Sequence, residues 1–345
     1  MDVSRRMLKT MCPEEECTYY LRVTDLAMMK TKTDKDYFAF TAHDQSGQMP
    51  MVLWDVSLLS AQNRRLISET GLALVQFRTN VYKDKVQGKV ISIKGANLFD
   101  IPQEEIQCLV PLAPENDDFY LASLYTLVHQ FEDEDLKGII EQVLRDNSKY
   151  LRRKPAAKAM HDDCINGLLH HTTRMAETAN LIRPVYPEVN WDLVIAGAIV
   201  HDIGKIQEFK LDALGLVSDY SKRGKMLGHQ YIGIDILQQS VQNYILSEIS
   251  SGGFPKNDKG EGEVPDKIWE FEMLLSHMIE SHHGKPEYGS AIIPKFMEAK
   301  VLNYLDELDA KIVMFKKAES DLEPGSFSAK TVFGLETSVY RPSFK

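Results

Sequence analysis

The chain has 345 residues, of which 43% are hydrophobic and 26% are charged, and its formal net charge is −10. This composition is typical of a globular protein with a sizeable core, the length favours two domains, and disorder over the whole chain is excluded. The longest apolar run, residues 193–200, is too short to span a membrane, and the charged N-terminus lacks the apolar stretch of a signal peptide. Four scattered cysteines are typical of free thiols in a reducing compartment, so we expect a cytoplasmic protein with no membrane partner.

The charge is unevenly distributed along the chain. Residues 1–100 contain 14 Lys and Arg against 12 Asp and Glu, whereas the remainder contains 26 against 38. Because phosphate binding depends on local patches rather than on total charge, the acidic sum does not exclude a nucleic-acid-binding first domain. The acidic balance of the second part suits a domain that binds cations.

The first hundred residues are expected to form a small β-barrel. Turn residues and alternating apolar positions predict a helix at about 57–69, ended by Gly71, and strands at 18–28, 37–44, 48–54, 72–82 and 85–96. Three strands, a helix and two strands is the order of an OB-fold, a five-stranded barrel that often binds oligonucleotides. Residues 43–55 resemble the second and third strands of nucleic-acid-binding OB domains.

On such a barrel, a single strand of nucleic acid crosses the second and third strands between two loops. Phe38 and Phe40 alternate with Tyr37, so we expect both phenylalanines in the core and leave Tyr37 and Trp54 open between core and ligand. The lysines of the two loops either contact phosphates or only solubilise the barrel. The residues predicted to bind nucleic acid are Lys30, Lys32, Lys35, Tyr37, Trp54, Lys83 and Lys85.

Residues 101–117, which contain three prolines, are expected to form an extended linker. From residue 118 onward, apolar positions recur with helical periodicity and continue to do so, which predicts an all-helical domain. A segment rich in Gly and charged residues, 252–262, is expected to be a loop between helices. The predicted organisation is a multidomain chain with a barrel at 1–100, the linker at 101–117, the all-α domain at 118–321 and a C-terminal tail at 322–345.

Histidines cluster in the helical part, where eight of the ten lie between positions 161 and 283. His201 and Asp202 directly follow an apolar helix, and neighbouring imidazole and carboxylate groups suit Mn, Fe, Co, Ni or Zn, whereas oxygen-only sites suit Mg or Ca. Two such ions can activate water and neutralise the leaving oxygen of a phosphate ester. Lys205, about one turn past the pair, is placed to contact a phosphate oxygen.

The order of these motifs resembles the HD-domain metal phosphohydrolases, an all-helical superfamily. The resemblance rests on His171, then His201–Asp202, then His229, then His282–His283, then a late Asp. It implies a second metal site formed by His229, His282 and His283 with Asp202 bridging, and a first site formed by His171, His201, Asp202 and Asp306. Asp309, three residues after Asp306, is expected to orient a ligand, although the two aspartates could exchange these roles.

Further blocks are similar to the YhaM-type 3′→5′ exoribonucleases, bacterial proteins with an N-terminal OB-fold and a C-terminal HD domain. The blocks are His161, ten residues before His171, and the segments 167–172, 281–284, 287–290, 305–310 and 331–342. The resemblance implies a 3′→5′ exonuclease of single-stranded RNA, with DNA as an option, that uses two divalent ions, Mn before Co, Fe, Ni or Zn. Catalysis is assigned to Asp202 and Lys205, and His161 is expected at the rim of the site. The chain departs from the family pattern at Met160, Asn166 and His170.

Three other functions are considered. The metal site could instead act on small nucleotides, with the barrel as a regulatory or oligomerisation module. A binding protein with a degenerate HD domain is disfavoured by the complete set of ligand residues, and a di-iron oxygenase is disfavoured by Lys205 and the barrel. Association into a homo-oligomer is left open, because no motif sets a stoichiometry.

Overall fold

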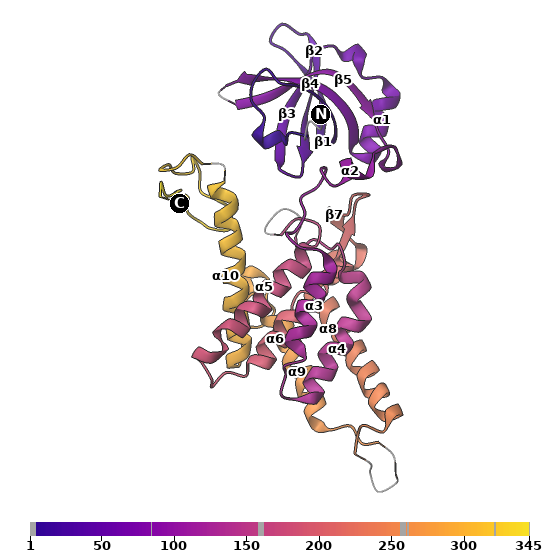
Figure 1. Ribbon diagram of the computed structural model, residues 1–345, viewed down its shortest axis with the longest axis vertical. Coiled ribbons are helices and arrows are strands. Elements are labelled where there is room, and N and C mark those ends of the chain that lie inside the picture. Colours follow the sequence, from indigo (N-terminus) through magenta and orange to yellow (C-terminus); the bar gives the residue numbers. More distant parts are fainter. Residues whose placement is uncertain are drawn as a thin grey trace. The chain divides into compact units, whose positions relative to one another are not determined.

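The chain folds into two compact units, Met1–Leu112 and Ala113–Lys345 (Figure 1). The computed structural model describes residues 5–83, 85–157, 162–255, 260, 262–320 and 322–344. Over these described ranges, no helix has the length and apolar character that a membrane span requires.

The first unit is a closed five-stranded barrel with the strand order β1-β2-β3-β5-β4. Its strands are β1 (Glu16–Lys30), β2 (Asp36–Asp44), β3 (Gly47–Leu53), β4 (Leu72–Tyr82) and β5 (Lys85–Gly95). β1 pairs with both β4 and β2 and changes register between Thr24 and Ala27, an irregularity that bends the strand around the barrel. A parallel pairing of β3 with β5 closes the barrel, which confirms the predicted five-stranded fold.

Alternating side chains fill this barrel. Phe38 and Phe40 of β2 are each 4% exposed and belong to one buried cluster with Met51 and Phe77, so their predicted place in the core is confirmed. Tyr37 lies on the opposite face of β2, and the centre of its ring is 4.9 Å from the centre of the Trp54 ring.

The helix between β3 and β4 begins later than the sequence predicted. The Ser60 side chain accepts a hydrogen bond from the Asn63 amide and starts α1 (Ala61–Thr70). The residues before it form a separate short turn, η2 (Val56–Leu58), because the Asp55 side chain caps that turn instead. Gly71 ends α1 with a φ of 69°, as predicted.

The segment expected to be an extended linker is partly folded onto the first unit. It contains α2 (Gln103–Ile106), and Glu105 forms an ion pair with Arg5. The Cys108 carbonyl also accepts a hydrogen bond from the Gln45 amide, at 2.8 Å. Two further short turns complete this unit, η1 (Leu8–Thr10) and η3 (Leu98–Asp100).

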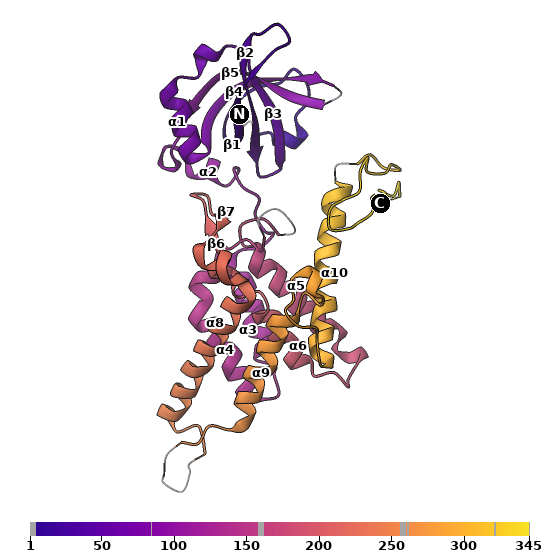
Figure 2. The same cartoon turned by 180° about the vertical axis from the view of Figure 1, so that it is seen from behind.

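The second unit is built around a helix that has no polar face. α6 (Trp191–Val200) is buried at every position because its sequence is apolar nearly all round, and α5, α9 and α10 pack against it (Figures 1 and 2). The surrounding elements are α3 (Asp117–Val128), α4 (Glu134–Leu151), α5 (Gly167–Ile182), η4 (Arg183–Val185), α7 (Lys205–Glu208), α8 (Lys222–Ser251), α9 (Asp266–Ser281), η5 (Pro286–Tyr288) and α10 (Met297–Glu319).

The predicted helical domain is confirmed, and it contains one element that the sequence analysis did not predict. A two-stranded hairpin, β6 (Phe209–Leu211) and β7 (Val217–Tyr220), lies between α7 and α8. The Asp212 side chain accepts hydrogen bonds from the amides of Leu214 and Leu216, and Gly215 has a φ of 90°, so a tight turn interrupts the helical course.

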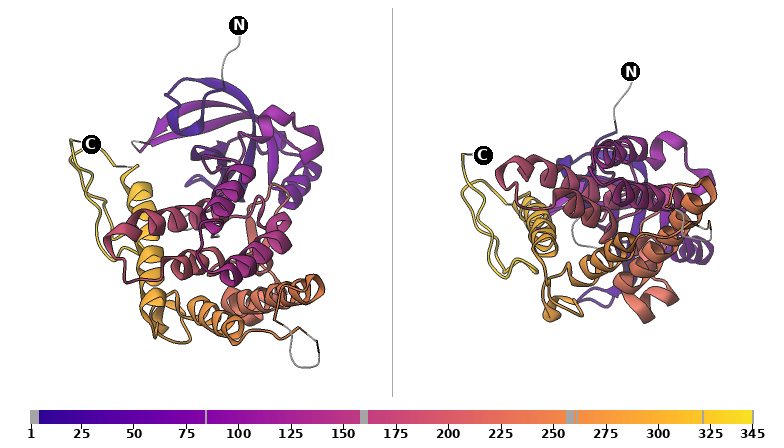
Figure 3. Two further views of the ribbon diagram at one scale, coloured as in Figure 1. Left: turned by 60° about the horizontal axis from the view of Figure 1, so that its bottom comes forward. Right: turned by 90° about the horizontal axis from the view of Figure 1, so that it is seen from below.

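The tail after α10 forms a second, irregular hairpin. The Ser328 amide donates to the Val339 carbonyl at 2.7 Å, and the Arg341 amide donates to the Ser326 carbonyl at 2.9 Å. Val339 is fully buried, so it anchors the second segment of this hairpin to the unit. Figure 3 shows this tail running back beside α10.

Candidate metal centre

The residues of the predicted site come from the C-terminal end of α6 and from α5, α8, α9 and α10. His201 and Asp202 follow the last turn of α6, and His282 directly follows α9. His229 lies in α8, one residue after Gly228, which has a φ of 71° and kinks the helix. A Cβ on Gly204 would lie 1.9 Å from the His229 carbonyl oxygen, so a glycine is required for α8 to approach this closely.

The first group of donor atoms converges on His171 Nε2. His201 Nε2 lies 3.3 Å from it, Asp306 Oδ1 3.3 Å and Asp202 Oδ2 3.9 Å. The side chains of His171 and His201 are fully buried, and that of Asp202 is nearly so. Two nitrogen donors and the Asp202 carboxylate thus lie within 4.8 Å of one another, with Asp306 beside His171, a donor set that fits a divalent transition metal.

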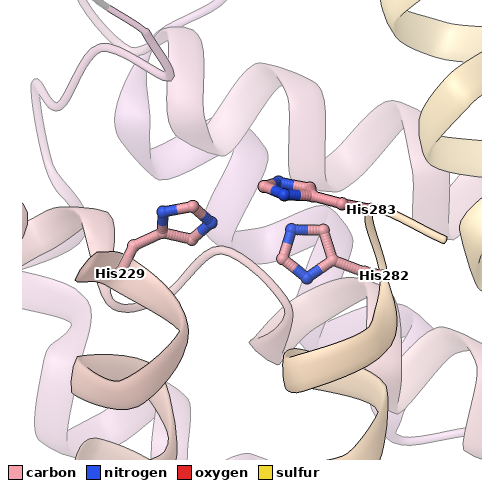
Figure 4. Close-up of side chains that lie close together, drawn as sticks. All are labelled: His229, His282 and His283. Atoms are coloured by element: carbon pink, nitrogen blue, oxygen red, sulfur yellow. The ribbon is translucent and has the colours of Figure 1, made fainter. Parts of the chain in front are cut away.

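The second group lies on the other side of Asp202. Figure 4 shows the three rings of His229, His282 and His283 meeting, and Asp202 Oδ1 lies 3.6 Å from His229 Nε2 and 3.8 Å from His282 Nε2. Among the described residues, four buried atoms here have no hydrogen-bond partner: Asp202 Oδ1, His229 Nε2, His282 Nε2 and His283 Nδ1. Leaving a buried polar atom unpaired costs about 1–3 kcal/mol, so this arrangement fits a cation that these atoms would coordinate.

The opposite ring nitrogens are held by hydrogen bonds. His201 Nδ1 donates to the Ala198 carbonyl at 2.8 Å, and His282 Nδ1 donates to the Ile279 carbonyl at 2.7 Å. His171 Nδ1 lies 2.7 Å from Asp309 Oδ2. Each of these contacts directs the Nε2 of its ring toward the other donor atoms, the arrangement by which proteins orient histidine ligands.

Asp306 and Asp309 therefore meet different nitrogens of the same ring. Asp306 lies on the Nε2 side of His171 with the other donors, whereas Asp309 lies on the Nδ1 side. Arg174 fixes Asp309 through its Nε, 2.7 Å from Oδ1, and also donates to Asp162 at 2.7 Å.

Electrostatics favour positive charge at the first group. Burial opposes the charged form of His171, but the carboxylates of Asp306 and Asp309 outweigh it and raise its pKa to about 10. Carboxylates that stabilise a proton on this ring would also stabilise a cation beside it. Burial and the neighbouring histidines hold the pKa of His282 well below its usual value, which keeps that ring neutral, as a ligand must be.

Lys205 stands at the edge of the same cluster. Its Nζ donates to Asp202 Oδ2 at 2.6 Å. Burial opposes its charge, but the Asp202 carboxylate outweighs burial and raises the pKa of Lys205, so the ammonium group persists. Lys205 and Asp202 line a cavity of about 640 Å³, together with Asp306 and residues of the tail.

Three residues that the sequence analysis did not single out support the cluster. Glu208 accepts hydrogen bonds from the His229 amide and ring. Arg174 donates to Asp309, and Asp162 contacts the His170 ring. Only Arg174 carried a signal in the sequence, because it follows His171 by three positions on one helix and so shares its face. His170 bonds Asp162 at 3.1 Å and stays outside the cluster, and the predicted rim residue His161 lies outside the described residues.

The predicted nucleic-acid face lies on the first unit. Trp54 is 42% exposed beside Tyr37, and all five lysines of the two loops are exposed. Lys30 pairs with Asp34 at 2.8 Å, and Lys83 lies over the Tyr82 ring at 5.4 Å. Tyr37 of β2 and Trp54, which directly follows β3, thus form an aromatic pair on the barrel, and such rings suit the stacking of single-stranded bases.

Comparison with known proteins identifies relatives of both units. Residues 168–311 match the HD domain family. The chain is 29% identical over 332 residues to the 3′-5′ exoribonuclease YhaM of Geobacillus sp. (strain WCH70), covering 96% of this chain and 93% of the relative. It is 28% identical to the 3′-5′ exoribonuclease YhaM of Oceanobacillus iheyensis, covering 96% and 95%. The chain thus contains an HD domain, and its predicted similarity to YhaM-type proteins is confirmed along almost its whole length.

Proposed function

We propose that this chain, an OB-type barrel joined to an HD domain, is a 3′→5′ exonuclease that hydrolyses single-stranded RNA to nucleoside monophosphates and depends on divalent metal ions. The observation that carries the proposal is the set of buried donor atoms around Asp202 that have no hydrogen-bond partner among the described residues. Asp202 also accepts a hydrogen bond from the ammonium group of Lys205, and both residues line the cavity. The similarity to YhaM exoribonucleases supports the substrate and the direction. Free cysteines at all four positions are consistent with action in the cytoplasm.

Asp202 would join the two groups of donors. Its Oδ2 faces His171 and His201 and its Oδ1 faces His229 and His282, so one carboxylate would serve two ions. Mixed nitrogen and oxygen donors favour Mn, with Co, Fe, Ni or Zn as alternatives. Two ions bound there would activate the attacking water and neutralise charge on the phosphate.

Lys205 would contribute a fixed positive charge to the reaction. Because Asp202 holds the ammonium group of Lys205 in the lining of the cavity, a phosphodiester that enters the cavity would meet this positive charge beside the ligand residues. The lysine would pair with a non-bridging phosphate oxygen and offset the charge that develops as the leaving oxygen departs.

The barrel would grip the rest of the strand. Stacking of a base on an aromatic ring stabilises a complex by about 1–3 kcal/mol, and Tyr37 with Trp54 offers such rings. The lysines at 30, 32, 35, 83 and 85 would add attraction to the phosphates that weakens with salt. Stacking does not distinguish ribose from deoxyribose, so single-stranded DNA is proposed as a second substrate.

The proposal is tested with 5′-labelled single-stranded RNA in chelator and after addition of Mn²⁺. We expect products that shorten from the 3′ end only when metal is present. Asp202→Ala should abolish hydrolysis while RNA binding persists, whereas Asp235→Ala, an exposed aspartate paired with Arg223, should behave as the parent chain. Intact RNA in both Mn²⁺ and Co²⁺ would contradict the proposal.

A second function is favoured by the size of the cavity. About 640 Å³ suits one small nucleotide, so the HD domain could hydrolyse small phosphate esters while the barrel regulates it. Tyr37→Ala with Trp54→Ala separates the two functions. Slower RNA decay with unchanged turnover of a small ester supports the exonuclease, whereas fast ester turnover without any RNA decay supports the second function.

A further inference from the structure

The cavity at the metal centre has two walls of different chemistry. One wall carries the charged groups Asp202, Lys205 and Asp306. The other comes from the C-terminal tail and contains Val332, Phe333 and Gly334, flanked by Thr331 and Glu336. The volume of about 640 Å³ falls within the range of small-ligand sites, so a single nucleotide can enter with its phosphate and base against different walls.

The tail wall is a built structure rather than a loose end. The Val332 amide donates to the Thr337 carbonyl at 2.9 Å, which closes a turn over residues 332–337. Gly334 has a φ of 82° within it, a conformation that favours glycine. Lys311 of α10 donates to the Gly334 carbonyl and ties the turn to the helix, beside which the tail runs in Figure 3.

Phe333 stands in this turn without apolar cover. It lines the cavity and yet is 85% exposed, and within the described part of the chain it has no ring partner. An aromatic face that water covers at the edge of a charged cavity is a ready surface for a flat, weakly polar group. A nucleobase has this shape, and its stacking does not depend on which base it is.

We infer that Phe333 stacks on the base of the 3′-terminal nucleotide and so sets the requirement for a base at that position. The inference rests on the proposed exonuclease function and assigns a part of that site to the tail. With the base held against the tail, the scissile phosphodiester lies toward Lys205 and the metal ligands. The enzyme would then accept all four bases but act poorly on an end that has none.

The experiment compares two RNAs that differ only at the 3′ end. One ends in a normal nucleotide and the other in an abasic residue of the same sugar and phosphate. Stacking of about 1–3 kcal/mol predicts a kcat/KM about 5–150-fold higher for the normal end in the parent chain. Phe333→Ala should lower kcat/KM for the normal RNA to the abasic level and leave the abasic RNA unchanged, whereas Phe333→Trp should keep the preference.

Phe344→Ala provides the matched control, since Phe344 belongs to the same tail, is 89% exposed and does not line the cavity. It should retain the parent preference. If Phe333→Ala also retains the preference, this inference is overturned while the exonuclease proposal stands.

Failure of the proposed function gives a different result, because the parent chain then degrades neither RNA. Calorimetric binding of adenosine 5′-monophosphate decides the inference in that case. Weaker binding by Phe333→Ala supports the stacking of a base on Phe333, and equal affinity of the variant and the parent chain overturns that stacking. The exposed position of Phe333 makes misfolding of the variant a minor concern, and an unchanged Tm verifies this.

Discussion

Glu208 holds His229 at two atoms. Its Oε1 accepts hydrogen bonds from the His229 backbone N at 3.0 Å and from the ring Nδ1 at 3.2 Å, and the Glu208 side chain is nearly buried. The pair fixes both the backbone of α8 at its kink and the direction of Nε2, which faces Asp202.

We therefore predict that Glu208→Gln weakens metal binding without preventing folding. Gln can still accept both hydrogen bonds through its Oε1, but it lacks the negative charge of the carboxylate. Loss of such a supporting group lowers metal affinity about 10–100-fold. Calorimetric titration with Mn²⁺ measures the affinity, with Glu270→Gln, an exposed glutamate of α9, as control. Equal affinities in both variants would contradict the role assigned to Glu208.

Arg174→Ala should destabilise the second unit. Arg174 joins Asp162 and Asp309, both largely buried, and removing one partner of such pairs costs about 3–5 kcal/mol. Chemical denaturation measures the loss. Arg223→Ala removes an exposed ion pair with Asp235 and should cost about 0–1 kcal/mol. If the two variants lose the same free energy of unfolding, Arg174 contributes no more to stability than an exposed arginine does.

Metal should stabilise the fold measurably. A ligand present at 100 times its Kd adds about 2.7 kcal/mol, which corresponds to about 5–10 °C in Tm for a unit of this size. We expect chelator to lower Tm by this amount and Mn²⁺ to restore it. Asp202→Ala should show no response to either treatment, because both groups of donors lose their shared carboxylate. A full response of that variant would place the bound metal elsewhere.

Asp133 should make stability depend on pH in the acid range. It caps α4 by accepting from the amides of Asp135 and Leu136, and it pairs with Lys267. Burial raises the pKa of Asp133, but these hydrogen bonds and Lys267 outweigh burial and lower it below the unfolded value of 3.8. A lowered pKa means that the stabilisation is complete above that value and is lost as the pH falls through the folded pKa.

Asp133→Asn isolates this effect, because Asn can cap the helix but carries no charge. We expect the parent chain to be more stable than the variant at pH 6 and the difference to shrink as the pH falls below about 3.8. Urea denaturation at a series of pH values measures it. If the difference in the free energy of unfolding does not change with pH, the charge of Asp133 has no part in the effect of the substitution.

Trp54→Ala should weaken binding of single-stranded RNA about 5–150-fold, the equivalent of one lost stacking interaction. Fluorescence anisotropy of a labelled RNA in chelator measures binding without hydrolysis. Phe99→Ala is the control, since Phe99 is 99% exposed on the same unit and lies outside the strands of the proposed face. Equal affinity of Trp54→Ala and the parent chain would exclude this face as the RNA site.

Local patterns predicted most of the fold. Alternation and turn residues gave the five strands of the barrel, and the apolar run at 193–200 gave α6, because both patterns follow from which side chains are buried. The hairpin β6–β7 was missed because strands of three and four residues are too short to show a period. The contact between 101–108 and the barrel was missed because it depends on tertiary hydrogen bonds.

The candidate site was predictable in its residue types but not in its geometry. The order and spacing of the histidines pointed to the cluster, whereas the hydrogen bond from His229 to Glu208 crosses 21 residues and that from Arg174 to Asp309 crosses 135. Asp306 and Asp309 share one face of α10, so only the position of the His171 ring between them separates their contacts.

The complete burial of α6 has a consequence for how the site is lost. Because every residue of this helix lies inside the unit, its amides can exchange with deuterium only when the surrounding helices separate. His201 and Asp202 continue directly from its last turn, so the geometry of the donor atoms depends on the slowest-exchanging segment that we expect in the chain. Local fraying of the tail should leave the donor atoms in place, whereas separation of the core helices should release them all in one step.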